Sequence, residues 1–460
     1  MVQRDRTFLW AFVLVGLGLK LLWLGRDELA HDEPFTVYQA FRPWADFVAM
    51  LGTENNPPLH FLLMRAWAPW VPLDAGWLRV PSALASAFTV WPLFLLARRQ
   101  AGTIAAISAA AIFTLNQHLY GYAHEVRAYA LFMLLTVAAF WQLVRMADGK
   151  PGARGWSLVV NVLLVYTHFF GWLVVGLQGL CMLLIKELRP RASPWGIALA
   201  VVAAYLPYAG ITLRRAGDSI GGTWLAAPAA EEVYNMVWRW SNMPVVAIGL
   251  LLLIAMALWR TKGRGTGLAL GLVWAMVPLL GMFLLSFWLP VYLDRYLVFA
   301  APGFAILAGC AVAAMPGRMS LVAATAVVLA MAATFEPWKG HGRRPSAVVD
   351  MAEDWRDSGP VLIQPPFFDH TYAWHLDSTL LRDARDLRAA LGERGIHAVH
   401  NTDDLPFGPQ AWDTLVLVDA WAALTDPDAT VKRALRANYA QVDSVEAMHK
   451  VWVYRFARRP

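Results

Sequence analysis

The chain has 460 residues, of which 58% are hydrophobic and 16% are charged, and its mean hydropathy is +0.45. Soluble domains carry about 25% charged residues, so this composition excludes an ordinary soluble protein and indicates a polytopic membrane protein. The net charge of +6 is the kind that basic loops beside a membrane produce, so we expect membrane lipids as partners and no nucleic acid.

Apolar runs recur along the first three quarters of the chain. A spanning helix needs roughly 20 apolar residues, and about eleven runs approach this length. They cover residues 8–24, 78–96, 102–119, 129–146, 157–172, 173–188, 196–212, 244–259, 268–289, 296–314 and 319–335. Because Arg4 and Arg6 precede the first run, a cleaved signal peptide is an alternative. No small-residue cleavage site follows this run, so we expect an uncleaved helix.

The basic residues fall in alternate loops, which predicts the orientation of the spans. These loops contain Arg98 and Arg99, Arg145, Lys186, Arg260 and Arg318. The N-terminal segment is also positively charged. The N-terminus is therefore expected in the cytoplasm. Residues 25–77, 120–128, 213–243 and 290–295, with everything after 336, are expected on the opposite side.

The first outer segment, residues 25–77, is too polar to span the membrane and is rich in aromatic residues. Pro34 suits the first turn of a helix, and the apolar positions after it have helical spacing: Phe41, Trp44, Phe47, Val48 and Leu51. A second helix is expected to begin at Pro57-Pro58. Both are predicted to lie in the membrane interface.

Two clusters of charged residues are expected on the same outer face. The stretch 27–33 holds Asp27 and Glu28, which we interpret as capping or solvated residues, and the acidic pair Asp32 and Glu33. The second cluster, at the junction of two apolar runs, contains His124, Glu125 and Arg127. Carboxylates beside a membrane span are costly, so the two clusters together indicate a cleft.

Two further regions of the chain, residues 213–243 and the tail after about residue 338, are less apolar than the predicted spans. Residues 213–243 read as a loop with Gly221-Gly222 and a short Trp-rich helix, either a lid or an ordinary interfacial loop. From about residue 338 the composition is that of a soluble domain. PVLIQPP and DTLVLVDA read as buried strands, and residues 381–395 and 426–439 as amphipathic helices, which predicts a small α/β domain. Cys181 and Cys310 lie in apolar runs and predict no disulfide.

Six motifs in this order resemble a known family: HDEPFT, NNPPLHFLL, RVPSALAS, YGYAHEVRAYAL, YTHFFG and LPVYLDRYLVFAAP. They are similar to the bacterial branch of the dolichyl-phosphate-mannose-protein mannosyltransferase superfamily and to the aminoarabinose transferases of lipid A. The resemblance implies a GT-C fold in the inner (cytoplasmic) membrane, with residues 1–337 as the catalytic domain. The change of composition and the alternating basic loops predict that residues 338–460 form a small extracytoplasmic domain. The resemblance also implies transfer, with inversion, of a sugar from a polyprenyl-phosphate donor to a hydroxyl of a protein, lipid or glycan.

The same resemblance assigns the catalytic base to Asp32, and a carboxylate in a partly dry cleft suits that step. Glu33 would hold Asp32 or the acceptor, and Glu125 would orient the acceptor or act as a second carboxylate. The donor phosphate is expected at Arg127, Arg295 and Tyr296, with His60, His124, His168 and Tyr129 as further substrate contacts. A divalent metal held by Asp32, Glu33 and His60 is an open alternative, and no other cofactor is expected.

Competing interpretations remain for these residues. Arg127 can pair with Glu125 and Arg295 with Asp294, and each histidine can be a structural residue at a helix end. Charged residues in a multispanning bundle also mark transporters, but the sequence has no inverted repeat and its polar residues gather at the outer face. A lipid-linked glycan polymerase or ligase is the other alternative, and a scaffold would leave the acidic clusters unexplained.

Overall fold

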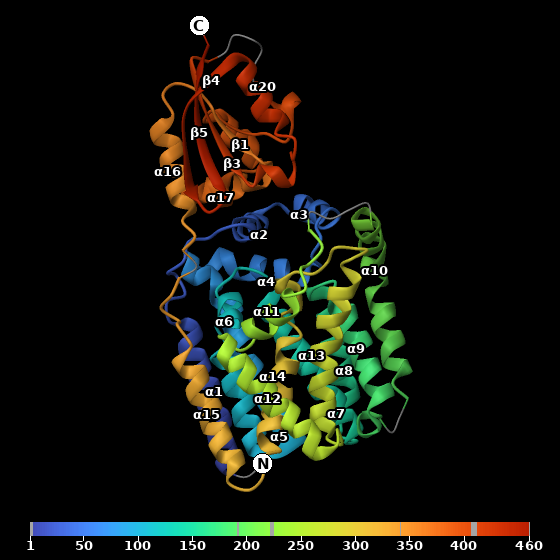
Figure 1. Ribbon diagram of the computed structural model, residues 1–460. Coiled ribbons are helices and arrows are strands. Elements are labelled where there is room, and N and C mark those ends of the chain that lie inside the picture. Colours follow the sequence, from blue (N-terminus) through green and yellow to red (C-terminus); the bar gives the residue numbers. More distant parts are fainter. Residues whose placement is uncertain (1–2, 191–192, 221–224, 341, 406–411, 460) are drawn as a thin grey trace. The chain divides into compact units, whose positions relative to one another are not determined.

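The computed structural model describes residues 3–190, 193–220, 225–340, 342–405 and 412–459 (Figure 1). The chain divides into two compact units, which are described in turn. Unit 1 consists of Met1–Trp23, Val48–His60 and Arg79–Trp338, and unit 2 of Leu24–Phe47, Phe61–Leu78 and Lys339–Pro460. The predicted division at residues 337 and 338 differs from these units in the first outer loop, parts of which belong to unit 2. As a domain boundary it stays a prediction.

Unit 1 is helical in the part of the chain that the structure describes. Its helices are α1 (Gln3–Leu21), α6 (Gln117–Ala123), α7 (Tyr129–Ala147), α8 (Ala153–Thr167), α9 (Gly171–Leu184), α10 (Trp195–Ile220), α11 (Glu232–Arg239), α12 (Pro244–Thr261), α13 (Thr266–Leu285), α14 (Ala301–Ala313) and α15 (Met319–Ala333), with 3-10 turns η2 (Lys186–Leu188) and η3 (Asp294–Leu297). Helices α3 (Trp44–Leu51), α4 (Leu59–Trp67) and α5 (Ala75–Thr114) each contain a boundary between the units.

The predicted apolar runs coincide with helices of unit 1. The runs 78–96 and 102–119 are the two arms of α5, which is kinked at Ala101 and Gly102, where the φ of Gly102 is 83°. Among the described residues, five helices are long and apolar enough to cross a membrane, namely α5, α7, α10, α12 and α13, and three shorter ones are apolar, α9, α14 and α15. The composition and these helices are those of a membrane protein, while the count of eleven spans stays a prediction.

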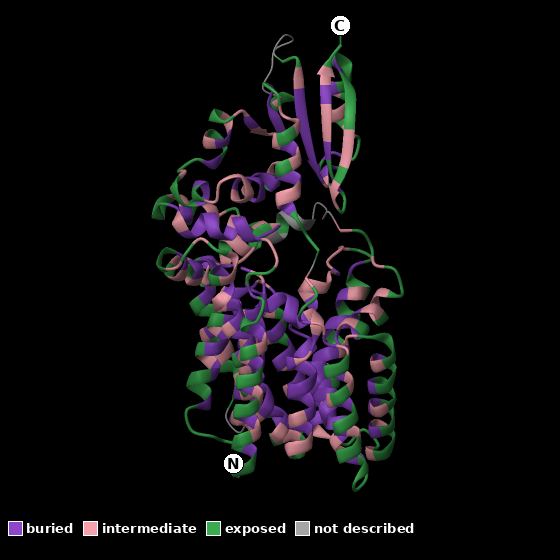
Figure 2. Cartoon of the chain, turned by 90° about the vertical axis from the view of Figure 1, so that its left-hand side faces the viewer, coloured by how far each residue is buried: buried purple, intermediate pink, exposed green. Residues whose placement is uncertain are grey.

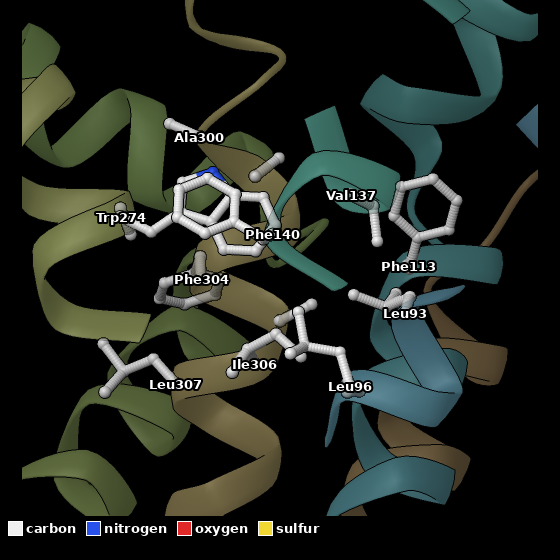
Figure 3. Close-up of a cluster of buried hydrophobic side chains, with 14 of the residues drawn as sticks. Leu93, Leu96, Phe113, Val137, Phe140, Trp274, Ala300, Phe304, Ile306 and Leu307 are labelled. Atoms are coloured by element: carbon white, nitrogen blue, oxygen red, sulfur yellow. The ribbon is translucent and has the colours of Figure 1, made fainter. Parts of the chain in front are cut away.

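The core of unit 1 is built around α14, whose residues Ala301–Val312 are all buried. Trp274 of α13 stacks on Phe140 of α7 with ring centroids 3.8 Å apart (Figure 3). Its indole N–H donates to the Phe299 carbonyl at 2.7 Å. A side chain at Gly303 would place its Cβ 2.6 Å from the Trp274 ring. Small residues thus bring α13 and α14 into close contact, as is usual between helices in a membrane.

The outer surface of the helices is apolar and exposed, whereas buried residues gather inside unit 1 (Figure 2). Three tryptophans near helix ends are almost fully exposed: Trp195 (78%), Trp259 (80%) and Trp288 (81%). Tryptophan is enriched where membrane helices meet the headgroups. These positions are therefore consistent with a bundle surrounded by lipid.

Unit 2 contains a five-stranded sheet in the order β2-β1-β3-β5-β4. The first three of these strands are parallel, and β5 and β4 continue the sheet antiparallel. Its elements are α2 (Asp32–Phe41), η1 (Ala68–Trp70), α16 (Pro345–Trp355), β1 (Val361–Gln364), η4 (Pro366–Phe368), α17 (Asp369–Leu376), α18 (Thr379–Asp383), α19 (Leu387–Glu393), β2 (Ile396–Ala398), η5 (Thr402–Asp404), β3 (Thr414–Ala420), η6 (Ala422–Leu424), α20 (Thr430–Asn438), β4 (Tyr439–Met448) and β5 (Val451–Arg458). Buried Leu415, Leu417 and Phe456 pack against α20, and the α/β prediction for the tail is confirmed.

Three local predictions were wrong. The helix predicted from Pro34 to Leu51 is two helices, α2 and α3, because Pro43 forces Arg42 into an extended conformation, with ψ 148°. The helix predicted over 381–395 is also two, α18 and α19. Helix α10 continues to Ile220 although the apolar run ends at 212, because hydropathy marks the end of the apolar surface and not of the helix. Gly221-Gly222, the centre of the predicted lid or loop, lies outside the described residues.

Candidate functional site

The short connection between α6 and α7 brings several predicted site residues into unit 1. Asn116 begins α6 by accepting a hydrogen bond from the Leu119 N–H at 2.9 Å. At the other end of α6, the His124 Nε2 atom lies 2.9 Å from the Lys20 carbonyl, and its ring lies 4.2 Å from that of Tyr120. These contacts join α6 to the end of α1 and give His124 a structural role. Its predicted contact with a substrate stays a prediction.

His168 lies in the break between α8 and α9 and is only 1% exposed. Its ring stacks on Phe132 at 4.9 Å with an interplanar angle of 15°. Its Nδ1 atom accepts the Phe170 N–H at 3.2 Å. The guanidinium groups of Arg127 and Arg295 are both near enough to act electrostatically on this imidazole. Two arginines from distant parts of the sequence therefore act electrostatically on one buried ring.

His60, in the first turn of α4, is buried next to the same connection. Burial lowers its pKa to about 3, and the positive charge of Arg127 adds to this effect, while a hydrogen bond with the Val126 backbone opposes it. The imidazole is therefore neutral near pH 7. The positive charge of this region comes from the arginines, and His60 contributes a neutral polar group beside them.

Tyr122, which the sequence analysis did not single out, interacts with several predicted site residues of unit 1. Tyr122 is buried, its ring lies 5.1 Å from that of Tyr129, and the charges of Asp294, Glu125 and Arg295 all act on its hydroxyl. Only its position in the motif YGYAHEV, two residues before His124, marks it in the sequence. Tyr122 is therefore an additional candidate site residue.

The η3 turn holds Arg295 and Tyr296. The Asp294 carboxylate accepts the Arg295 backbone N–H at 2.7 Å, and it faces the guanidinium of Arg239 at 3.7 Å. Arg239 is thus one guanidinium partner of Asp294, and the alternative pairing of Asp294 with the Arg295 guanidinium stays a prediction. The Arg295 guanidinium lies over the Tyr296 ring at 5.6 Å, and that ring lies 5.2 Å from Phe170, close to His168.

Asp32 and Glu33 belong to unit 2. Asp32 is the exposed first residue of α2, and Glu33 is 6% exposed and accepts the Ala30 N–H at 3.2 Å. His31, the residue before Asp32, has φ 54° and ψ −121°, which is a strained conformation for a residue with a side chain. Strain of this kind clusters at functional sites, so it draws attention to the residue that follows, Asp32.

Asp27 and Glu28 were interpreted as capping or solvated residues. The Glu28 carboxylate accepts the backbone N–H of Ser346 at 2.9 Å and its hydroxyl at 2.6 Å, at the beginning of α16. A carboxylate at this position satisfies an N–H group that the helix cannot pair itself. The capping interpretation is therefore confirmed for Glu28.

The metal site predicted at Asp32, Glu33 and His60 stays a prediction. Among the described residues, no group of three or more His, Cys, Asp or Glu side chains is arranged to hold a metal ion. Asp32 and Glu33 lie in unit 2 and His60 in unit 1.

No family model matches the chain, and no curated protein matches it in sequence. Solved structures do match. ArnT from Cupriavidus metallidurans bound to undecaprenyl phosphate has a TM-score of 0.59 and 14% identity over 97% of each chain, and its apo state has 0.60 and 14% over 98% of each. The Archaeoglobus fulgidus oligosaccharyltransferase tethered with an acceptor peptide containing the NVT sequon has 0.51 and 10%, over 80% of this chain and 62% of that one. The chain thus has the fold of these GT-C glycosyltransferases, which confirms the predicted fold.

Proposed function

We propose that this protein is a polyprenyl-phosphate-dependent glycosyltransferase that transfers a sugar, with inversion, to a hydroxyl acceptor on the outer face of the membrane. The proposal is supported by buried His168, whose ring lies 6.3 Å from that of Tyr296 and on which the charges of Arg127 and Arg295 act. This arrangement occurs in a chain with the fold of ArnT bound to undecaprenyl phosphate. The alternating basic loops support a cytoplasmic N-terminus and an extracytoplasmic C-terminal domain.

The reaction gives the two groups of residues different tasks. The bond between the anomeric carbon and the phosphate oxygen breaks, and its electron pair leaves with the polyprenyl phosphate. Arg127 and Arg295, with Tyr296 beside them, neutralise that leaving group, since guanidinium groups bind phosphate by charge-assisted hydrogen bonds. The buried, neutral His60 and His168 hold the sugar or the phosphate without adding charge.

On the acceptor side, the hydroxyl oxygen forms the new bond to the anomeric carbon and loses its proton to the Asp32 carboxylate. A carboxylate suits this step when it reaches the hydroxyl by a hydrogen bond. Glu33 supports the turn that carries Asp32, and Glu125 orients the acceptor, with Tyr129 and His124 as further contacts. The donor sugar is mannose, arabinose, aminoarabinose or a related sugar, and the acceptor is a protein, a lipid or a cell-envelope glycan.

The test is transfer of a labelled sugar from polyprenyl-phosphate donors to membrane acceptors by the detergent-solubilised protein. The wild type is compared with Asp32→Asn and with Asp46→Asn at equal amounts of protein. Asp46 is a matched control because it lies in the same outer segment and its carboxylate faces Arg385 at 3.8 Å. We expect transfer by the wild type and by Asp46→Asn, and a loss of about 100- to 10,000-fold in Asp32→Asn.

Other outcomes would redirect the proposal. Equal activity of Asp32→Asn and the wild type would remove Asp32 as the base and point to Glu33 or Glu125. If no donor supports transfer while labelled lipid or sugar crosses reconstituted vesicles, the protein is a transporter. Elongation of a lipid-linked glycan in the same assay would instead identify a polymerase or ligase.

A further inference from the structure

Helix α2, which carries Asp32 and Glu33, is held at both ends by the part of unit 2 that follows residue 339. At the N-terminal end, the Thr371 hydroxyl donates to the His31 carbonyl at 3.2 Å. The His375 Nε2 atom lies 2.9 Å from the Leu29 carbonyl. Two consecutive turns of α17 therefore bind the backbone of the segment that leads into α2.

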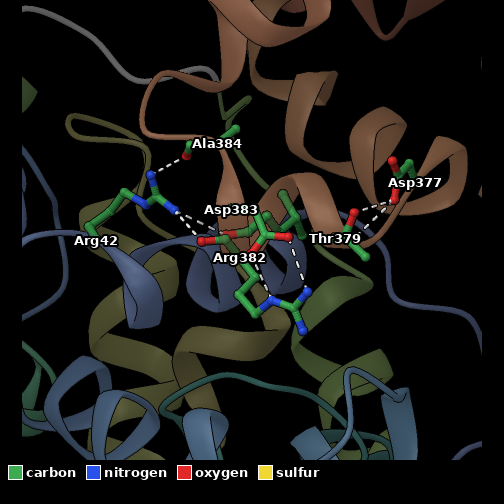
Figure 4. Close-up of polar contacts among 7 residues, drawn as sticks. Arg42, Asp377, Thr379, Arg382, Asp383 and Ala384 are labelled. Carbon is green, nitrogen blue, oxygen red and sulfur yellow. Dashed lines mark hydrogen bonds and ion pairs between the residues drawn. The ribbon is translucent and has the colours of Figure 1, made fainter.

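At the C-terminal end, Arg42 is 4% exposed and its guanidinium donates to four backbone carbonyls around the end of α18 (Figure 4). These carbonyls belong to Leu381, Arg382, Ala384 and Arg385. The last carbonyls of a helix have no partner within the helix, so Arg42 satisfies them from α2. Hydrogen bonds to a charged donor are among the stronger ones in proteins, and this one guanidinium makes several.

Tyr38 adds a second contact between the same elements. Its hydroxyl donates to the Arg385 carbonyl at 2.9 Å and accepts the Leu387 N–H at 3.3 Å, at the beginning of α19. The Arg42 guanidinium lies over the Tyr38 ring at 3.9 Å. Because Tyr38 of α2 and Arg42, the residue that follows α2, both bind the α18–α19 connection, the end of α2 has a fixed direction within unit 2.

The strained residue lies between these two attachments. A residue in a sparsely populated conformation is strained and persists only when its surroundings determine it. His31 has φ 54°. Its carbonyl is bound by Thr371, and its ring lies 5.1 Å from that of Trp421, which follows β3. The contacts that hold this conformation therefore come from the C-terminal part of the chain.

We infer that the C-terminal α/β domain is a positioning device for the acidic pair: through Thr371 and Trp421 it fixes the strained turn at His31 and thereby the orientation of Asp32. This inference rests on the proposed function, in which Asp32 is the base. Thr371 and Trp421 are positioning residues, because they touch His31 and not the reacting atoms. A small misplacement of a catalytic group costs up to roughly 100-fold in rate, so such a device affects kcat strongly.

The experiment compares Thr371→Val with Thr371→Ser in the full-length protein in detergent. Valine keeps the shape of threonine but removes the hydroxyl, whereas serine keeps the donor to the His31 carbonyl. For Thr371→Val we expect a kcat for sugar transfer about 10- to 100-fold below the wild type, with the KM for the donor unchanged. Thr371→Ser should keep most of the wild-type kcat. Thermal unfolding of each variant shows whether it is folded.

A second measurement does not depend on sugar transfer. Amide hydrogen exchange, read by mass spectrometry, should become faster in residues 28–33 of Thr371→Val and Trp421→Ala and stay unchanged in α7 and α13. Unchanged exchange in residues 28–33 of both variants would overturn the inference, as would equal kcat values of Thr371→Val and the wild type. If the wild type transfers no sugar, the proposed function fails, while the exchange experiment still decides whether these residues fix the turn.

Discussion

The two groups of candidate residues are held in different ways. In unit 1, His60 and His168 are buried, and His168 stacks on the ring of Phe132. In unit 2, the segment around Asp32 is held by hydrogen bonds, in which side chains such as Arg42 and Thr371 bind backbone carbonyls. Packing of rings fixes a position through shape and exclusion of water, whereas hydrogen bonds to the backbone fix a direction. The difference therefore separates residues whose position depends on packing from residues whose direction depends on individual hydrogen bonds.

In unit 1, the largest effect is expected from removing the positive charge of Arg127 or Arg295. Arg127→Met and Arg295→Met should each lower kcat/KM for the polyprenyl-phosphate donor by roughly 10- to 100-fold, because a hydrogen bond to a charged group contributes about 1.5–3 kcal/mol. The measurement is transfer rate against donor concentration. Arg99→Met is the control, since Arg99 pairs with Asp148 at 2.6 Å. Equal losses in all three variants would show that the effect is general and not that of a phosphate site.

Much of this cluster could be found from the sequence, and some of it could not. Apolar runs marked the helices because lipid contact requires apolar side chains along each span, and charged residues at the ends of these runs then stood out. Tyr122 was missed because a tyrosine in an aromatic-rich motif has no distinguishing pattern. The partners of Arg42 could not be predicted, since backbone carbonyls some 340 residues away leave no mark in the sequence. The edge strand β4 was missed because most of its side chains are polar or exposed.

The hydrogen bonds that hold unit 2 can be tested at Asp369, which is fully buried at the beginning of α17. Burial alone would raise the pKa of this carboxyl, but the charges and hydrogen bonds of His370 and Arg388 lower it below its usual value. Asp369→Asn should destabilise the protein by about 1–3 kcal/mol, because both buried carboxylate oxygens accept hydrogen bonds, from the His370 N–H and from Arg388 at 3.0 Å, and an amide replaces one of these acceptors with a donor. Thermal unfolding in detergent measures this, and an unchanged midpoint would contradict it.

Buried His60 in unit 1 should make the stability of the protein depend on pH. The pKa of His60 is lowered to about 3, chiefly by burial, while the unfolded chain has an ordinary histidine pKa near 6.5. Below pH 6.5 the unfolded state binds a proton that the folded state does not, so stability is lost as the pH falls, by about 2 kcal/mol at pH 5. His60→Gln lacks this titration. Its unfolding midpoint should therefore change less between pH 7.5 and pH 5 than that of the wild type, and an equal or larger change would contradict the buried, neutral histidine.

The smallest effect on stability is expected at the ion pair between Arg382 and Asp383, which has short distances like the Asp369–Arg388 pair but lies at the surface. Arg382 donates to both carboxylate oxygens of Asp383 at 2.8 and 3.0 Å (Figure 4). Both side chains are largely exposed, 49% and 60%, so water replaces each partner when the other is removed. Asp383→Asn should therefore leave the unfolding midpoint unchanged in the assay that detects Asp369→Asn. If the two substitutions destabilised the protein equally, burial would not be what distinguishes the hydrogen bonds that hold unit 2, and the contrast between its buried contacts and its surface would fail.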